Sequence, residues 1–164
     1  MGRSHKFYLS LGSNVEPDKN LAAAMARLRE RGIIRETSSV WESPAVGAPG
    51  PNFLNLCVSY EAQVGENELK TRIIRPIESA LGRIRSHDKN SPRTIDIDIV
   101  MVDGRPLSLD RWEHAFVALP MSELRPQLSH PLTHHGPAHM APEHANAAWI
   151  VRRQESIVEN SQPM

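Results

Sequence analysis

Residues 94–99 of the chain, Thr-Ile-Asp-Ile-Asp-Ile, alternate polar and apolar side chains, and Val100 follows directly. This alternation predicts a strand in which the isoleucines face one side and Asp96 and Asp98 face the other. Their Cα atoms are expected about 6.6 Å apart, and like charges on one strand face repel each other. A divalent cation would relieve that repulsion, because carboxylate oxygens are preferred Mg²⁺ ligands. A half-buried strand with a solvated polar face gives the same pattern, so both interpretations stay open.

The segments around this strand predict an α+β fold. Strand patterns cover 6–11, 33–41, 53–61 and 94–102, and apolar residues recur at helical spacing over 18–32 and 66–81. The order strand, helix, strand, strand, helix, strand is that of the ferredoxin-like βαββαβ sandwich. We therefore expect an antiparallel sheet with helices on one face.

Residues typical of helix caps, turns and kinks predict where these strands and helices begin, end and bend. We expect Asp18 to cap the first helix and Gly32 to end it. Pro76 should kink the second helix, because proline removes a backbone hydrogen bond. Asp103-Gly104 predicts a tight turn into 105–109, and the apolar run 116–119 predicts a further short strand.

Composition limits the classes of function that the chain can have. Its 164 residues include 19 Lys and Arg and 19 Asp and Glu, so its formal net charge is zero. A nucleic-acid or membrane-surface binder usually carries a basic excess, so neither partner is expected. We find no signal peptide and no apolar run long enough to span a membrane, and the single cysteine, Cys57, fits a buried thiol. These features predict a cytoplasmic monomer with one domain at 1–150 and a flexible tail at 151–164.

A local basic segment precedes the aspartate strand. Residues 70–93 contain seven Lys or Arg and two Asp or Glu, a net charge of +5. Arginine binds phosphate oxygens through two parallel hydrogen bonds, so cations beside a carboxylate pair are typical of a metal–phosphate site. We expect this role of Arg83 and Arg93, whereas Lys70, Arg72 and Arg75 are expected on a solvated helix face.

An ordered set of motifs resembles the 6-hydroxymethyl-7,8-dihydropterin pyrophosphokinase family from about residue 5 to residue 130. The most specific motif is Pro92-Arg93-Thr94-Ile95-Asp96-Ile97-Asp98-Ile99. The other matching stretches are Leu11 to Asn14, Thr37 to Pro44, Asn52 to Asn55, and Glu78 with Leu81 to Arg85; Phe116 to Pro120 and Glu123 match more weakly. The resemblance implies the ferredoxin-like fold and the transfer of pyrophosphate from ATP to a hydroxymethyl dihydropterin in folate biosynthesis, with AMP leaving.

The resemblance also implies a role for individual residues. Catalytic residues would be Arg83, Arg93, Asp96 and Asp98, and the two aspartates would hold two Mg²⁺ ions against the ATP phosphates. Pterin-binding residues would be Ser43, Pro44, Val46, Phe53, Asn55 and Phe116, with the two phenylalanines stacking on the ring. ATP-binding residues would be Glu78, Arg83, Arg93, Arg111 and His114.

Two segments depart from the family pattern. The loop before Pro92 has Asn90-Ser91 where the family usually carries Trp-Gly, and His114 stands where the family has an arginine. The segment between Leu109 and Phe116 is also shorter than in the family and has no clear equivalent of the family's nucleotide-contacting histidine and aromatic residue, for which Arg111, Trp112 and His114 are the candidate substitutes. A non-catalytic pterin- or nucleotide-binding protein, or one with altered specificity, is the alternative function. Five histidines between 130 and 144 are expected in a surface segment rather than a metal site.

Overall fold

The computed structural model describes residues 2–44, 50–84, 93–107 and 114–127, and the backbone of 151–152. The expectations for Val46, Arg111, Trp112, Asn90-Ser91 and the histidines from 130 to 144 lie outside the described residues.

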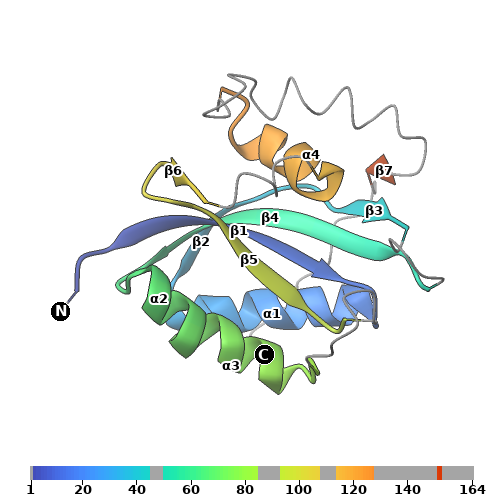
Figure 1. The fold of residues 1–164 in the computed structure, drawn as a ribbon, viewed down its shortest axis with the longest axis horizontal. Coiled ribbons are helices and arrows are strands. Elements are labelled where there is room, and N and C mark those ends of the chain that lie inside the picture. Colours follow the sequence, from blue (N-terminus) through green and yellow to red (C-terminus); the bar gives the residue numbers. More distant parts are fainter. Residues whose placement is uncertain (1, 45–49, 85–92, 108–113, 128–150, 153–164) are drawn as a thin grey trace, which may run out of the picture.

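An antiparallel sheet forms the centre of the molecule (Figure 1). In the described part of the chain its strands are β1 (His5–Ser13), β2 (Ile33–Thr37), β3 (Trp41–Ser43), β4 (Phe53–Ala62), β5 (Asp96–Val102), β6 (Arg105–Pro106) and β7 (Val151–Arg152). Their order is β6-β5-β1-β4-β3-β7, and β2 also pairs with β4. The central strands β1, β4 and β5 have the neighbours that a ferredoxin-like βαββαβ sandwich requires, so the predicted fold class is confirmed.

Helices cover both faces of this sheet, which corrects the expectation of helices on one face. The helical segments are α1 (Pro17–Arg31), α2 (Glu66–Glu68), the π-helical η1 (Leu69–Ile74), α3 (Arg75–Ala80) and α4 (Ala115–Leu124). Figure 1 shows α1, α2 and α3 on one face and α4 on the opposite face. The strand expected at 116–119 is wrong, because these residues lie in α4. Val117 and Met121, one helical turn apart, both pack against the sheet residue Tyr8 and its neighbours.

The larger hydrophobic core lies between the sheet and helices α1 and α3. It includes alternate residues of the central strands, such as Leu9, Leu11, Ile97 and Ile99. The intervening residues of these strands therefore point to the face that α4 covers. Cys57 is one of them, and it is fully buried, as expected of a core thiol. Burial raises the pKa of its thiol to about 12.

The predicted single strand at 33–41 is divided into β2 and β3. Both pair with β4, and Ser38 lies between them. The Ser38 backbone N–H donates to the Cys57 carbonyl at 2.9 Å, and the Cys57 N–H donates to Ser38 Oγ at 2.9 Å. A serine side chain thus takes the place of a main-chain acceptor, which satisfies a buried N–H of the central sheet.

Helix boundaries also differ from expectation. Helix α1 begins at Pro17, so Asp18 lies in its first turn and Glu16 occupies the cap position. The irregularity expected at Pro76 takes the form of η1, in which the Arg75 N–H bonds to the carbonyl of Lys70, five residues back. Pro76 follows directly and has no N–H to continue the ordinary α-helical pattern.

The C-terminal segment expected as a tail contributes to the sheet. Val151–Arg152 pair with β3 as β7. The assignment of 1–150 as the domain and the flexibility of the remaining residues stay predictions. No helix among the described residues is long and apolar enough to cross a membrane.

Replacing Ser38 tests the junction between β2 and β3. Ser38→Ala should lower the free energy of unfolding by about 1–3 kcal/mol, because it leaves the buried Cys57 N–H without its acceptor. Urea denaturation measures the change. Ser39→Ala is the matched control, since the Ser39 backbone N–H, not its hydroxyl, makes its contact with Glu123. Equal stability of the two variants would contradict the role of the Ser38 hydroxyl.

Candidate active site

Strand β5 presents the two aspartates at an edge of the sheet. On one side it pairs with β1, with Asp96 opposite Gly12 and Asp98 opposite Ser10. Among the described residues its other side meets β6 only from Met101 onward. Asp96 and Asp98 are therefore partly exposed, whereas Ile97 and Ile99 are buried in the core. This confirms the alternation predicted from the sequence.

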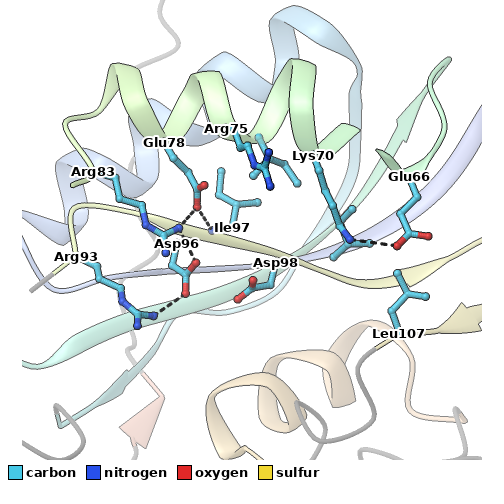
Figure 2. Close-up of a pocket in the computed structure, with 12 residues that line it drawn as sticks. Glu66, Lys70, Arg75, Glu78, Arg83, Arg93, Asp96, Ile97, Asp98 and Leu107 are labelled. Carbon is cyan, nitrogen blue, oxygen red and sulfur yellow. Dashed lines mark hydrogen bonds and ion pairs between the residues drawn. The ribbon is translucent and has the colours of Figure 1, made fainter. Parts of the chain in front are cut away.

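A chain of ion pairs surrounds Asp96 (Figure 2). Arg83 Nη1 donates to the Glu78 carboxylate and also to Asp96 Oδ1, the latter at 2.9 Å. Arg93 Nη1 donates to Asp96 Oδ2 at 3.0 Å. Both carboxylate oxygens of Asp96 are thus bonded to arginines, and both arginines expected to bind phosphate lie beside an expected metal ligand.

Glu78 is the buried residue in this series of ion pairs. Its side chain is 5% exposed, and its Oε2 accepts the Ile97 N–H of β5 at 3.1 Å. Burial raises the pKa of Glu78, although the Ile97 N–H and the Arg83 guanidinium act in the opposite direction. Burial alone would lower the pKa of Arg83, but the adjacent Asp96 and Glu78 carboxylates raise it. Glu78 therefore holds β5 and Arg83 together from the helix side.

Asn14 positions the other arginine, a role that the sequence did not reveal. The Arg93 backbone N–H donates to Asn14 Oδ1 at 2.7 Å, and the Asn14 N–H donates to the Arg93 carbonyl at 3.1 Å. Asn14 is buried in the turn after β1, where the sequence indicated only a turn. The pairing joins residues 79 positions apart in the chain, so no local pattern could have found it.

A cleft of about 380 Å³ opens between the edge of β5 and the segment from α2 to α3. Its lining comprises Glu66, Lys70, Ile74, Arg75, Glu78, Arg83, Arg93, Asp96, Ile97, Asp98, Ile99 and Leu107. Lys70 and Arg75 are exposed, as expected of a solvated helix face, and both also line this cleft (Figure 2). Arg72 is exposed and pairs with Glu68, as a solvated helix residue does.

The residues expected to bind pterin gather on the sheet face that α4 covers. Asn55 lies opposite Gly12 and Trp41, and Ser43 lies opposite Phe53. Asn55 Nδ2 donates to Ser43 Oγ at 3.1 Å, and both side chains are buried. By strand alternation Phe53 and Asn55 share the face of Asp96 and Asp98. Pro44 follows Ser43 directly, at the end of β3.

Helix α4 brings Phe116 to the same face. Phe116 is partly buried and packs against the cluster that also contacts Trp41. Glu123 holds the helix to the sheet, because its carboxylate accepts the Ser39 N–H at 2.7 Å and the Trp41 Nε1–H at 3.2 Å. Sequence patterns assigned no role to Glu123, since its partners lie more than 80 positions away.

His114 stacks on Phe116. The ring centroids are 4.9 Å apart and the ring planes are inclined by 12°. In the described residues the imidazole therefore lies against an expected pterin-binding ring, whereas the resemblance implied contact with the nucleotide. None of the residues lining the cleft described above belongs to α4.

The donor set at β5 fits magnesium together with a phosphate. No cluster of three or more His, Cys, Asp or Glu side chains suited to a metal occurs within the described residues. Magnesium in phosphate-binding sites usually takes one or two carboxylates and completes its shell with phosphate oxygens and water. Asp96 and Asp98, neighbours on one strand face beside the cleft, supply such a pair.

The fold and this cleft define the class of protein. A carboxylate pair flanked by arginines has the groups with which phosphoryl-transfer enzymes hold metal ions and phosphate. The chain matches the family model described as 7,8-dihydro-6-hydroxymethylpterin-pyrophosphokinase (HPPK) over residues 8–126.

Individual relatives agree with this match. The 2-amino-4-hydroxy-6-hydroxymethyldihydropteridine pyrophosphokinase of Synechocystis is 34% identical over 133 residues, which cover 74% of this chain and 67% of that protein. The folic acid synthesis protein FOL1 of Dictyostelium discoideum is 31% identical over 137 residues, 77% of this chain but only 20% of that protein. A crystal structure of Plasmodium falciparum HPPK-DHPS has a TM-score of 0.65 at 12% identity, covering 88% of this chain and 46% of that one, and shows the shared fold.

The chain belongs to the HPPK family. The predicted family and the predicted enzyme class, a pyrophosphokinase, are confirmed. The roles of single residues in catalysis and in binding pterin, ATP and magnesium are proposals. The cleft and the α4 face show where the described residues among them lie.

Removing Glu78 tests the buried ion-pair chain. Glu78→Ala should destabilise the protein by about 3 kcal/mol in urea denaturation, because it leaves Arg83 without one partner and the Ile97 N–H without its acceptor. Glu68→Ala is the control, since Glu68 is exposed and its ion pair with Arg72 should contribute no more than about 0.5 kcal/mol. A loss no larger than that of the control would show that Glu78 does not hold Arg83 and β5 together.

Proposed function

We propose that the chain transfers pyrophosphate from ATP to 6-hydroxymethyl-7,8-dihydropterin in folate biosynthesis, and releases AMP. The observation that supports this most directly is the bonding of both Asp96 oxygens to Arg83 and Arg93 in the wall of a cleft. Such a site carries the cations and carboxylates that a magnesium-bound triphosphate needs.

The nucleotide would occupy the cleft between β5 and the segment from α2 to α3. Arg83 and Arg93 would exchange Asp96 for phosphate oxygens, since guanidinium groups bind phosphate through paired hydrogen bonds. Released from the arginines, Asp96 would be available, with Asp98, to hold Mg²⁺. Glu78 would keep Arg83 anchored during this exchange through its own ion pair.

The pterin would lie on the α4 face, against Asn55 and between Phe53 and Phe116. A flat heterocycle stacks well on aromatic rings, and a carboxamide can donate to and accept from its polar edge. Ser43 fixes the Asn55 carboxamide through the hydrogen bond to Nδ2. Because Asn55 and Asp96 both lie opposite Gly12, the two substrates would meet over β1.

The reaction joins the pterin hydroxymethyl oxygen to the β-phosphorus of ATP and breaks the bond from that phosphorus to the oxygen that leaves with AMP. The chain's contribution is to align the two substrates and to neutralise phosphate charge with Arg83 and Arg93. Bound magnesium would supply further charge neutralisation at the phosphates. Asp98 is the candidate to accept the hydroxyl proton.

The remaining expectations accompany this proposal. ATP would serve as co-substrate, Asp96 and Asp98 would hold two Mg²⁺ ions, and the enzyme would work as a cytoplasmic monomer. Its partners are these small molecules rather than nucleic acid or membrane.

Asp96→Asn tests the metal and phosphate role at nearly constant side-chain volume. It should lower the rate of AMP formation in the presence of the dihydropterin at least about 100-fold, because a neutral amide is a poor magnesium ligand. Asp103→Asn is the control: Asp103 follows the same strand but pairs with His5 and the Lys6 N–H, away from the cleft. Full activity of Asp96→Asn would contradict the proposed metal site.

His114→Ala tests which substrate the His114–Phe116 stack serves. The dissociation constant for the dihydropterin should rise about three- to tenfold, because the ring that stacks on pterin loses its aromatic support. His114→Phe should keep wild-type pterin affinity. Calorimetry with a non-hydrolysable ATP analogue and Mg²⁺ should give unchanged nucleotide affinity for both variants, and a selective loss of that affinity would instead assign His114 to the nucleotide.

A further inference from the structure

Gly12 occupies the position between the two halves of the site. On one side of β1 its cross-strand partner is Asn55 of β4, and on the other side it is Asp96 of β5. The proposed pterin-recognition amide and the proposed metal carboxylate therefore flank the same glycine. A side chain at this position would point to the face that carries both groups.

The structure leaves no room for such a side chain. A Cβ atom at Gly12 would lie 2.8 Å from Asn55 Oδ1, closer than real Cβ contacts come. The next nearest atoms, Asn55 Cγ and the Leu54 carbonyl oxygen, would both be 3.9 Å away, an ordinary contact distance. The conflict is therefore with one atom of one carboxamide rather than with the backbone.

Backbone conformation does not explain the glycine. Gly82 and Gly104 are the glycines with positive φ in the described part of the chain, and Gly12 is not among them. Its backbone is that of a regular strand, paired on both sides, which any residue can adopt. The steric conflict with Asn55 thus remains as the reason for the missing side chain.

Asn55 cannot yield to a Cβ without a cost. Its side chain is buried, and its Nδ2 donates to Ser43 Oγ, which is buried too. Among the described residues, the hydrogen bond to Ser43 fixes the Asn55 carboxamide, and the Oδ1 atom of Asn55 lies toward Gly12. Turning or displacing the amide would stretch the bond to Ser43 and change the direction in which the amide meets a ligand.

We propose that Gly12 is a positioning residue for pterin recognition: its missing side chain allows the Asn55 carboxamide to lie across β1, where Ser43 fixes it. The inference rests on the proposed function, because it takes Asn55 as a pterin-binding residue. It adds that the orientation of the bound pterin depends on β1, because Gly12 of this strand lies opposite both Asn55 and Asp96.

Gly12→Ala tests the proposal through a difference between the two substrates. The dissociation constant for 6-hydroxymethyl-7,8-dihydropterin, measured by calorimetry, should rise about tenfold or more, as expected for a lost or misaligned hydrogen bond. Binding of Mg²⁺ with a non-hydrolysable ATP analogue should change less than about twofold. Gly65→Ala is the matched control, since a Cβ there meets nothing within 4 Å and φ is not positive.

A double-mutant cycle with Asn55→Ala identifies the atom in conflict. If Gly12 acts through the Asn55 amide, adding Gly12→Ala to Asn55→Ala should change pterin affinity and melting temperature little, although Gly12→Ala alone lowers both. Should Gly12→Ala alone fail to fold, recovery of the fold in the double variant would support the same conclusion. Failure of both variants to fold would overturn it, because the conflict would then lie elsewhere.

The outcomes separate this proposal from the proposed function. Equal weakening of pterin and nucleotide binding by Gly12→Ala, unchanged pterin binding, or independent effects of the two substitutions would each overturn the positioning role. If the wild-type chain binds no hydroxymethyl dihydropterin, the proposed function fails. In that case the melting-temperature cycle still decides whether Gly12 makes room for Asn55.

Discussion

The guanidinium of Arg83, shared between Glu78 and Asp96, is the interaction on which the site depends. It joins the end of the helical segment to the edge strand, and it sets Asp96 next to a cation before any ligand is present. Arg83 has two anchors, the buried carboxylate of Glu78 and the partly exposed carboxylate of Asp96. In the proposed function, one anchor would be exchanged for phosphate while the other remained. The site would then keep a fixed cation, and the Asp96 carboxylate would become available when the triphosphate binds.

The second constraint is the register of β1 between β4 and β5. It places Asn55 and Asp96 on either side of Gly12, so the proposed pterin and nucleotide subsites lie next to each other over β1. Contacts from α4 complete the pterin side, because Glu123 ties that helix to Ser39 and Trp41. In the proposed function this register of the sheet would help to orient the two substrates, which suits a reaction whose catalysis is mainly alignment and charge neutralisation.

The sequence predicted those parts of the structure that local patterns determine. The alternation around Asp96 and Asp98 was sufficient to predict β5 and its two faces, and the order of strands and helices predicted the ferredoxin-like sandwich. It failed for α4, because the short run at 116–119 suits a strand or a helix equally and only packing against Tyr8 and Cys57 decides between them. Asn14 and Glu123 were missed because each acts on residues roughly 80 positions away, and single-sequence patterns do not report such contacts.

The transfer of pyrophosphate to the dihydropterin is tested by phosphorus NMR of the products after incubating the chain with ATP, Mg²⁺ and 6-hydroxymethyl-7,8-dihydropterin. AMP should form in equal amount to a pterin that carries two linked phosphates, and neither product should form when the dihydropterin is omitted. The β- and γ-phosphorus atoms of ATP would thus move together. Formation of ADP with a singly phosphorylated pterin, or AMP formation that does not depend on the dihydropterin, would contradict it.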